Sequence, residues 1–246
     1  MSSVEGAVRA ARRAVVFTGA GISQESGIGT FRGPGGLWER FRPEEVATPE
    51  AFAARPELVA RWYAERFAAM RAAVPNPGHR AIASWEALFP SLVVVTQNID
   101  RLHQRAGSRD VLELHGTLWV SRCARCRREV ATESLPPAEP PPARCDCGGM
   151  FRPGVVWFGE ALPLDVFARA EAEVAAADLF VAVGTSATVW PAAGLIELAA
   201  ASGALLVEVN RDETPMSRLA ALKRRSAAGE ELPRLGEEWG RWRSPS

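Results

Sequence analysis

Short runs of apolar residues recur along the chain, and each ends in small or polar residues. The runs cover residues 14–17, 92–96, 111–114, 179–183 and 205–209. Apolar runs of this length without polar alternation are typical of parallel strands that are buried on both faces. A helical pattern at residues 191–201 separates the last two runs, as a strand-helix-strand unit requires. The pattern predicts an α/β fold with a doubly wound parallel sheet.

A glycine-rich loop follows the first predicted strand. Gly19 and Gly21 come directly after residues 14–17, where open α/β sheets bind nucleotides. Both glycines can adopt positive φ and bring the backbone close to a pyrophosphate, and we expect a helix after Ile22 to direct its positive end there. The dinucleotide fingerprint is incomplete, because its third glycine would fall at Gln24 and the next strand begins only at residue 92. The loop therefore predicts a nucleotide site but argues against a dehydrogenase.

A helix expected at residues 55–72, after a start marked by Thr48 and Pro49, carries an arginine on its apolar face. The apolar stripe consists of Leu58, Val59, Trp62, Tyr63, Phe67 and Met70. Arg66 lies on the same face, and its side chain neighbours that of Tyr63 three residues earlier. One interpretation is that Arg66 reaches solvent at the edge of the stripe. The other is a phenol and guanidinium pair that holds a carboxylate in a cavity.

Polar residues follow two further strands. Gln97, Asn98 and Asp100 come after residues 92–96 and are candidates for contacts with a ribose or a carboxamide; a helix cap with a structural aspartate is the alternative. His115 follows residues 111–114 beside a glycine, where a general base could stand. His79 and His103 lie at the start of one helix and within another, so we expect structural roles for both.

Four cysteines lie close together in a proline-rich segment. Cys123 and Cys126 form a C-x-x-C pair, and Cys145 and Cys147 form a C-x-C pair. Two such pairs predict one structural zinc ion held by four thiolates, with a less regular geometry at the second pair. Residues 152–160 then form an extended segment with exposed-type aromatic residues, which could be a hinge or could pair with a peptide by strand addition.

Composition limits the classes of partner. The 246 residues carry 29 basic and 29 acidic side chains, so the charge balance does not indicate binding to nucleic acid or to a membrane surface. One basic cluster, Arg122, Arg125, Arg127 and Arg128, surrounds the first cysteine pair and favours a nucleic-acid-binding module as the competing reading. No apolar stretch is long enough to span a membrane, and the N-terminus lacks the apolar core of a signal peptide. We expect a cytoplasmic protein.

Together these motifs resemble those of the sirtuins, which are NAD-dependent protein lysine deacylases. They are G-A-G-I-S-Q-E-S-G-I-G-T-F-R at 19–32, Q-N-I-D at 97–100, L-H-G at 114–116, the cysteine pairs, V-V-W-F-G-E at 155–160, G-T-S at 184–186 and V-N at 209–210. The resemblance implies a Rossmann-like NAD-binding domain of residues 1–32, 75–118 and 154–246. It also implies a small domain of residues 33–74 and 119–153, with a helical insertion and the zinc module. Gly29, where many sirtuins have proline, is a departure.

The resemblance also implies roles for individual residues. NAD would contact Gly19, Ala20, Gly21, Ile22, Ser23, Glu25, Phe31, Arg32, Trp38, Gln97, Asn98, Ile99, Asp100, Gly184, Thr185, Ser186, Asn210, Arg211, Asp212 and Ala228. Catalysis would involve His115 and Asn98. The acyl-lysine substrate would contact Ala47, Tyr63, Arg66, Val156, Trp157, Phe158, Gly159 and Glu160. Zinc would be bound by Cys123, Cys126, Cys145 and Cys147.

In the reaction that the resemblance implies, the acyl oxygen attacks C1′ of the nicotinamide ribose of NAD, the co-substrate, and nicotinamide leaves. His115 serves as the base for the ribose hydroxyls, so that the 2′-oxygen attacks the acyl carbon. Water completes the transfer, and the products are free lysine and 2′-O-acyl-ADP-ribose. Tyr63 and Arg66, with Ala47, resemble the subgroup that removes succinyl and malonyl groups, whose bacterial members often remove acetyl as well. The alternative is a deacetylase with a structural Arg66. The expected partners are acyl-lysine proteins or peptides, and we expect a monomer.

Overall fold

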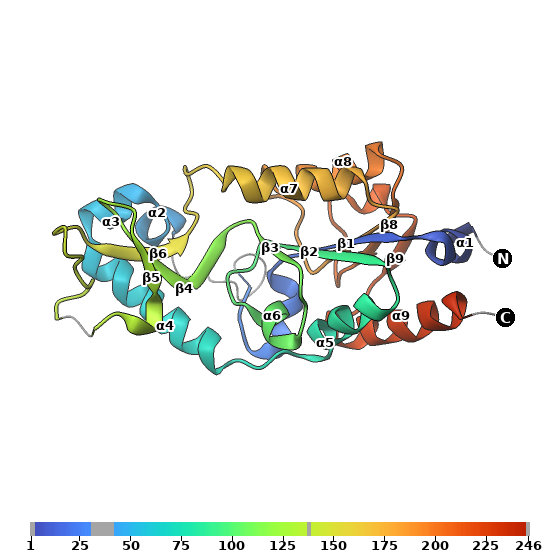
Figure 1. Ribbon diagram of the computed structural model, residues 1–246, viewed down its shortest axis with the longest axis horizontal. Coiled ribbons are helices and arrows are strands. Elements are labelled where there is room, and N and C mark those ends of the chain that lie inside the picture. The colour runs from blue at the N-terminus through green and yellow to red at the C-terminus, as the bar shows by residue number, and fades with distance from the viewer. Residues whose placement is uncertain (1–2, 31–41, 137–138, 245–246) are drawn as a thin grey trace.

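A six-stranded sheet forms the body of the protein. The structure is a computed structural model that describes residues 3–30, 42–136 and 139–244. The strands are β1 (Arg13–Thr18), β2 (Ser91–Thr96), β3 (Val111–Glu113), β7 (Leu179–Val183), β8 (Leu205–Val209) and β9 (Leu222–Arg224). Their order is β3-β2-β1-β7-β8-β9, and all neighbours are parallel (Figure 1). This confirms the predicted doubly wound parallel sheet, and the order is that of dinucleotide-binding folds.

Helices cover both faces of this sheet. One face packs against α1 (Ser3–Ala10), α5 (Pro77–Ser84) and α9 (Ala228–Arg243), and the other against α7 (Leu164–Ala175) and α8 (Gly194–Ala201). Within β1, Val16 belongs to the first apolar cluster and Val15 and Phe17 to the second. Successive side chains of a strand point to opposite faces. This explains why the run carries no polar alternation.

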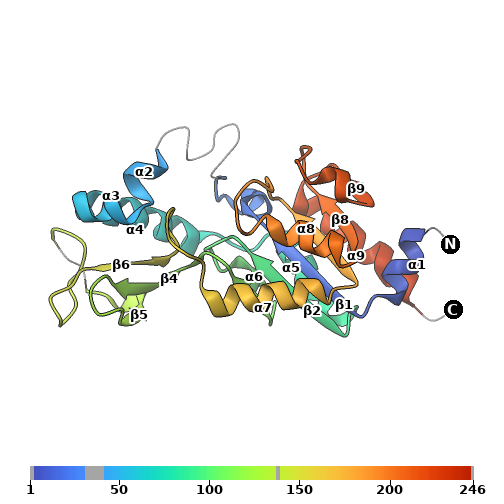
Figure 2. The same ribbon diagram turned by 90° about the horizontal axis from the view of Figure 1, so that it is seen from above.

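A smaller region lies at the end of the molecule opposite both termini (Figures 1 and 2). It contains the antiparallel sheet β5-β4-β6 and the helices α2, α3 and α4. Their bounds are β4 (Gly116–Cys123), β5 (Glu129–Ala131), β6 (Phe151–Val155), α2 (Pro43–Val46), α3 (Pro49–Ala54) and α4 (Pro56–Ala72). The Thr48 hydroxyl caps α3 by accepting a hydrogen bond from the Ala51 amide at 3.1 Å, as predicted. The domain boundaries expected from the sequence stay a prediction.

The structure differs from the sequence-based expectations at several elements. The helix expected after Ile22 is a 3₁₀ helix, Ala20–Ser26, that starts two residues earlier. Leu58 is 41% exposed and lies outside the buried face of α4. Neither β9 nor α9 was predicted. In the part of the chain that the structure describes, no helix combines the length and apolar character needed to cross a membrane.

Candidate active site

A cavity opens where the loops after β1, β7 and β8 meet. Its volume is about 800 Å³. The sheet order reverses between β1 and β7, and ligands of open α/β sheets bind at such a switch point. Two backbone hydrogen bonds join the loops there: the Gly19 amide donates to Val183 O at 3.0 Å, and the Gly21 amide to Gly184 O at 2.8 Å.

The glycines of the first loop allow close backbone contact, and the predicted positive φ was wrong. Gly19 has φ −126°, and the positive φ at the contact between these two loops is that of Gly184, at 57°. A Cβ atom on Gly21 would lie 2.7 Å from Gly184 Cα, and one on Gly19 would lie 2.9 Å from Gly184 O. Any side chain at these positions would therefore push apart the two loops that form the floor of the cavity.

The structure brings most of the predicted site residues to this one cavity. From the predicted cofactor set, the lining includes Gly19, Ala20, Gly21, Gln97, Asn98, Ile99, Gly184, Thr185, Ser186, Asn210, Arg211, Asp212 and Ala228. From the catalytic and substrate sets, it includes His115, Ala47, Tyr63, Arg66, Val156, Trp157, Phe158, Gly159 and Glu160. Ile22, Ser23, Glu25 and Asp100 do not line it. Phe31, Arg32 and Trp38 lie outside the described residues.

Ser23 and Asp100 do not line the cavity; they support the Asn98 side chain through hydrogen bonds. The Asn98 amide nitrogen donates to Gly19 O at 3.1 Å and to the Ser23 hydroxyl at 3.2 Å. The Ser23 hydroxyl in turn donates to an Asp100 carboxylate oxygen at 2.7 Å. Burial raises the pKa of Asp100, while hydrogen bonds from Leu102 and Ser23 act in the opposite direction. This chain of hydrogen bonds fixes the position of the Asn98 side chain at the cavity lining.

Glu25 connects the first loop to the C-terminal helix. Its carboxylate accepts a hydrogen bond of 2.7 Å from the Gly229 amide in the first turn of α9. A Cβ atom on Gly229 would lie 2.9 Å from this carboxylate. The contact satisfies an amide that has no partner within its own helix, and it places a negative charge at the positive end of α9. Ala228, which lines the cavity, lies beside this contact.

His115 is arranged as a neutral base. Its Nδ1 lies 2.9 Å from Gln97 O, and because a carbonyl can only accept, Nδ1 carries the proton and donates it. Nε2 is then the unprotonated nitrogen. Burial lowers the pKa of His115, with the Gln97 hydrogen bond acting in the opposite direction. The ring can therefore accept a proton at neutral pH.

His79 and His103 have no atoms in the cavity lining. Their rings meet edge to face with centroids 5.0 Å apart, and His103 Nε2 lies 3.0 Å from the Thr18 hydroxyl. Burial lowers the pKa of His79 to about 4, and burial also lowers that of His103. Both are buried in the body, as expected for structural residues.

The far wall of the cavity is built on α4 and the segment after β6. Trp157 Nε1 donates to the Tyr63 hydroxyl at 3.0 Å, so the phenol's own hydrogen can donate to a group in the cavity. Burial raises the pKa of Tyr63, which keeps the phenol protonated. Arg152 stacks on the Trp157 ring and donates two hydrogen bonds to Glu160, at 2.5 and 2.8 Å. These contacts fix Trp157 and Glu160 before any substrate arrives.

Arg66 lines the cavity beside Tyr63 and rests on its own helix. Its guanidinium carbon lies 3.3 Å from the centre of the Trp62 ring, and Nη1 donates to Trp62 O at 2.6 Å. Burial lowers the pKa of Arg66 to about 10, so the side chain keeps its positive charge at neutral pH. The guanidinium is thus half-buried at the cavity wall, against the Trp62 ring.

The segment predicted to receive a peptide is less extended than expected. Val156 N donates to His115 O, and Phe158 N donates to Ala47 O. Phe158 and Gly159 then form a turn, with φ 87° at Gly159, closed by a hydrogen bond from Glu160 N to Trp157 O at 3.0 Å. Trp157 is only 2% exposed, so only Phe158 fits the expected exposed aromatic character.

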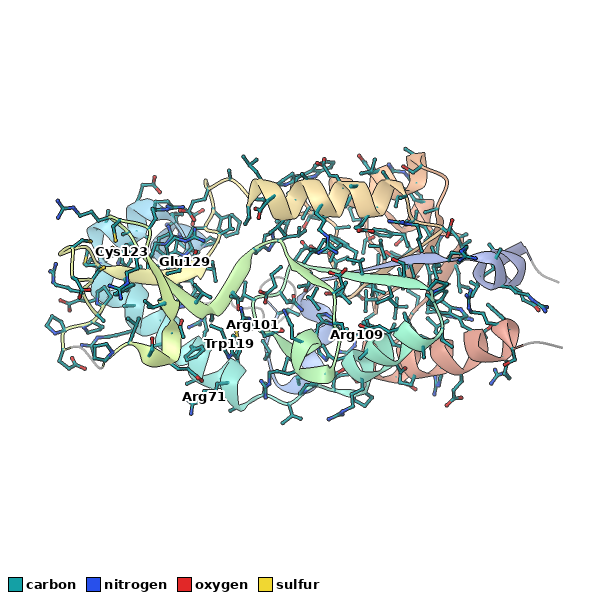
Figure 3. All side chains as sticks on the ribbon, viewed as in Figure 1. Arg71, Arg101, Arg109, Trp119, Cys123 and Glu129 are labelled. Atoms are coloured by element: carbon teal, nitrogen blue, oxygen red, sulfur yellow. The ribbon has the colours of Figure 1, made fainter. Side chains whose placement is uncertain are left out.

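The four cysteines form the predicted metal site. All four sulfur atoms lie within 4.8 Å of one another, and two of the pairs lie at 3.5 Å (Cys123 and Cys147) and 3.8 Å (Cys126 and Cys145). Tetrahedral zinc with bonds of about 2.3 Å requires sulfur atoms roughly 3.8 Å apart. The chain turns at Gly148, with φ 82°, and Cys145 N donates to Gly149 O. This turn brings the C-x-C pair to the other two cysteines. Figure 3 places Cys123 in the small region, remote from the main sheet.

The arginines around the cysteines are largely engaged locally. Arg122 pairs with Glu129 at 2.6 Å, and Arg128 pairs with Asp146 at 2.6 Å. Arg125 donates to the carbonyl oxygen of Cys147 at 2.8 Å. The cluster is thus not an open basic face of four free charges.

Sequence reasoning did not identify several further residues of the lining. These are Gln24, Thr30, Trp62, Val155, Leu162, Thr188, Val189, Trp190, Pro191, Val209, Glu213, Thr214, Pro215, Ser226 and Ala227. Most of them directly continue a motif at the end of a strand, such as residues 188–191 after β7 or residues 213–215 after β8. Because the loops at the carboxyl ends of strands share one crevice, extending each motif by a few residues would have found them.

A doubly wound sheet with this cavity at its switch point, joined to a four-cysteine module, defines a nucleotide-binding α/β protein with a structural metal site. A family model described as the Sir2 family matches residues 19–191. The chain belongs to the Sir2 family.

Individual relatives agree with this assignment. The NAD-dependent protein deacylase 2 of Pyrobaculum aerophilum is 52% identical over 227 residues, which cover 92% of this chain and 91% of that protein. The crystal structure of a Sir2 homologue in complex with NAD is 46% identical, with a TM-score of 0.92 over 99% of this chain and 95% of the other. A complex of Sir2 with a p53 peptide and NAD⁺ is 37% identical, with a TM-score of 0.86 over 98% of each chain.

Proposed function

We propose that this NAD-dependent protein deacylase removes succinyl and malonyl groups from lysine, and acetyl groups as well, giving nicotinamide, free lysine and 2′-O-acyl-ADP-ribose. The observation that carries the proposal is that Tyr63 and Arg66 line the same cavity as His115. A phenol hydrogen and a guanidinium at one end of the cavity are suited to an acyl carboxylate, and a histidine base serves the chemistry.

The cofactor half of the cavity fits NAD. A side chain on Gly19 or Gly21 would meet the Gly184 backbone, so the two loops lie close together and present backbone to the cavity. Gly19, Gly21 and Gly184, whose amides donate to backbone carbonyls of the body, would form the floor beneath the phosphates. Asn98, which donates to the Ser23 hydroxyl, would face the nicotinamide side. When bound, NAD would supply the ribose carbon that the acyl oxygen attacks and nicotinamide as the leaving group. This chain supplies orientation, exclusion of water and proton transfer.

His115 would move the proton. Its Nδ1–H is committed to Gln97 O, which leaves Nε2 to accept a proton from a ribose hydroxyl. Because the carbonyl fixes both the tautomer and the ring orientation, no rearrangement is needed before the transfer. The lowered pKa keeps Nε2 unprotonated at neutral pH.

The acyl end of the cavity would favour acyl groups that carry a negative charge. In the half-buried position of Arg66 its charge is screened less than on the surface, and an incoming carboxylate would restore the interactions lost with water. Ala47, 5% exposed and also in the lining, keeps this end of the cavity wide. An acetyl group offers no such partner, so it would bind less tightly but could still react.

A second candidate is a deacetylase in which Arg66 only stabilises α4. The contacts of Arg66 with the ring and the carbonyl of Trp62 favour this reading. The two candidates differ in one respect: whether removing the guanidinium changes the preference between acyl groups.

The test is nicotinamide release from NAD with acetyl-lysine and succinyl-lysine peptides of the same sequence. We expect the parent protein to favour the succinyl peptide. We expect Arg66→Met and Tyr63→Phe to lower kcat/KM for it about 10- to 100-fold while changing acetyl turnover little. Arg61→Met, on the exposed side of α4 in a pair with Glu139, is the matched control. Equal losses for both peptides would favour the second candidate.

We also propose that the enzyme acts as a monomer on proteins and not on nucleic acid. The local pairing of Arg122 and Arg128 supports the second part, because a nucleic-acid site needs cationic groups that are free to meet phosphates.

A further inference from the structure

Two carboxylates are buried in the part of the chain that the structure describes, Asp100 and Glu208. Asp100 supports Asn98 through Ser23. Glu208 lies in β8, is 5% exposed and is not part of the cavity lining. Leu206, two residues earlier on the same side of the strand, packs into the apolar cluster against α7 and α8. A charge buried at such a position lowers stability unless its oxygens are paired.

The partners of Glu208 come from two segments that continue into the cavity lining. Oε1 accepts a hydrogen bond of 2.7 Å from the Thr214 hydroxyl, and Oε2 accepts one of 2.6 Å from the Ser217 hydroxyl. Arg225 Nη1 forms an ion pair with Oε2 at 2.6 Å, and Arg225 Nη2 donates to the Ser217 hydroxyl at 3.0 Å. The Thr214 amide donates to the same hydroxyl at 2.8 Å, so the loop after β8 closes on itself around the carboxylate.

These two segments form one wall of the cavity. Residues 209–215, which include the end of β8 and the loop after it, and residues 226–228, after β9, all line it. A backbone hydrogen bond from Asn210 N to Arg224 O, at 3.1 Å, joins the segments at their start. The Glu208 carboxylate bridges them further on, because it pairs with Thr214 of the first and with Arg225 at the start of the second. Because Glu208 and Arg225 do not line the cavity, we expect them to affect a ligand through the position of this wall.

We propose that Glu208 is a positioning residue for the cofactor: its carboxylate holds the two segments where the adenosine half of NAD needs them. The proposal rests on the proposed function in one respect, namely that residues 210–212 contact this half. It does not depend on which acyl group is removed. His115 lies between β3 and β4, away from this wall, so Glu208 sets the affinity for NAD and not the rate of the chemical step.

The experiment uses the full chain with zinc bound. It measures kcat and KM for NAD from nicotinamide release with a saturating acetyl-lysine peptide, and Kd for ADP-ribose by calorimetry. Glu208→Gln keeps the size of the side chain and removes its charge. We expect KM for NAD and Kd for ADP-ribose to rise by the same factor, roughly tenfold, while kcat changes less than about twofold. A lower Tm with unchanged KM and Kd would show a purely structural role and overturn the proposal.

Arg225→Met removes the same ion pair from its other side. Glu208→Gln removes a negative charge and Arg225→Met a positive one, so a long-range electrostatic effect on the NAD phosphates would change the affinity in opposite directions. Positioning predicts a weaker affinity in both variants. It also predicts a double variant about as weak as either single one, because the pair can be lost only once. Opposite effects of the two single variants would contradict the positioning role.

Two further variants separate the remaining outcomes. Glu238→Gln is the matched control: its carboxylate pairs with Arg224 at 3.0 Å and lies outside the cavity lining, so KM and Kd should not change. Asn210→Ala removes an expected cofactor contact and should weaken binding of NAD and ADP-ribose. If it does so while Glu208→Gln does not, or if the control loses affinity equally, the positioning role alone is wrong. If neither Asn210→Ala nor Glu208→Gln changes either affinity, the assignment of this wall to NAD is wrong, and the positioning role is wrong with it.

Discussion

The body and the small region hold their shape by different means. In the body, the sheet is buried between two large apolar clusters, one on each face. Around the cysteines, the buried cluster is only Cys123, Ala143, Cys145 and Phe151, with Val130, Leu135 and Cys147 partly buried against it. A bound metal can replace a hydrophobic core in so small a unit. The α4 wall of the active site has a third apolar cluster of its own, which includes Val59, Trp62, Tyr63 and Trp157. The comparison teaches that both walls of the active site depend on packing, and that only the cysteine module beyond them depends on a metal.

The two ends of the cavity are also built from different parts of the protein. The cofactor end is made of backbone from glycine loops of the body, while the acyl end is made of side chains from α4 of the small region. Changes in the body should therefore act through cofactor binding and overall stability. Changes in the small region should act through the substrate.

Removal of zinc should have the largest effect, and it should separate the small region from the body. Binding of a structural zinc is worth about 10 to 16 kcal/mol in small zinc-dependent units. We expect a chelator to abolish deacylation and to expose β4, β5 and β6 to proteolysis while the sheet of the body still melts cooperatively. Limited proteolysis with mass spectrometry checks this. Resistance of residues 116–155 after chelation would show that zinc does not hold this region together.

His115 stands where the body joins the small region, between β3 and β4. His115→Ala should lower kcat about 10²- to 10⁴-fold, the usual contribution of a general base, while NAD binding persists. The lowered pKa also predicts a pH profile: activity needs the neutral ring, so kcat/KM should stay level above pH 6.5 and fall as the pH drops through the histidine's pKa. A decline that begins well above pH 6.5 would contradict this assignment, provided that zinc content stays constant.

Gly21→Val tests the cofactor end of the cavity, which is built from glycine backbone. The added side chain would meet Gly184, and overpacking of this kind costs about 1–3 kcal/mol. We expect lower thermal stability and a loss of NAD affinity, measured by calorimetry. Gly6→Ala in α1, where a Cβ atom meets nothing within 4 Å, is the control. Unchanged NAD binding in Gly21→Val would mean that the loops can separate without cost.

Glu25→Ala should give the smallest effect. It removes the carboxylate that caps α9, and loss of a cap costs about 1 kcal/mol. For a chain of this length this lowers Tm by roughly 2–4 °C. Glu44→Ala, at a carboxylate that is exposed on α2, is the matched control and should leave Tm unchanged. A large loss of NAD affinity without a change in Tm would instead return Glu25 to the cofactor contacts expected from the sequence.

Within the body, the sequence predicted the inner strands better than the C-terminal elements, for a physical reason. Strands buried on both faces appear as apolar runs, and small or polar residues at their ends mark the crevice. The sixth strand, β9, has only three residues, Leu222–Arg224, and two of them are basic, so it resembles a loop. The α9 sequence includes Pro233 and three glycines, which lower its intrinsic preference for a helix. Packing of Leu232, Leu235 and Trp239 against the sheet stabilises the helix in the folded protein.

Tertiary contacts explain what the motifs could not. The loop glycines were expected to supply positive φ, but their role depends on Gly184, which is far away in the sequence. Glu25, expected among the cofactor contacts, accepts a hydrogen bond from the Gly229 amide, 204 positions away. For Tyr63 and Arg66 the spacing predicted adjacent side chains, yet the hydrogen bond from Trp157 that orients the phenol comes from residues 94 positions away.

The most direct test of the central claim is a double-mutant cycle at the acyl carboxylate. It combines the parent protein and Arg66→Met with a succinyl-lysine peptide and its uncharged carboxamide analogue, and it measures kcat/KM from nicotinamide release. If Arg66 contacts the carboxylate, the two changes should be coupled by about 1–2 kcal/mol, roughly a 5- to 30-fold departure from additivity. Additive effects would show that Arg66 does not read the acyl charge, and the acidic-acyl function would be wrong.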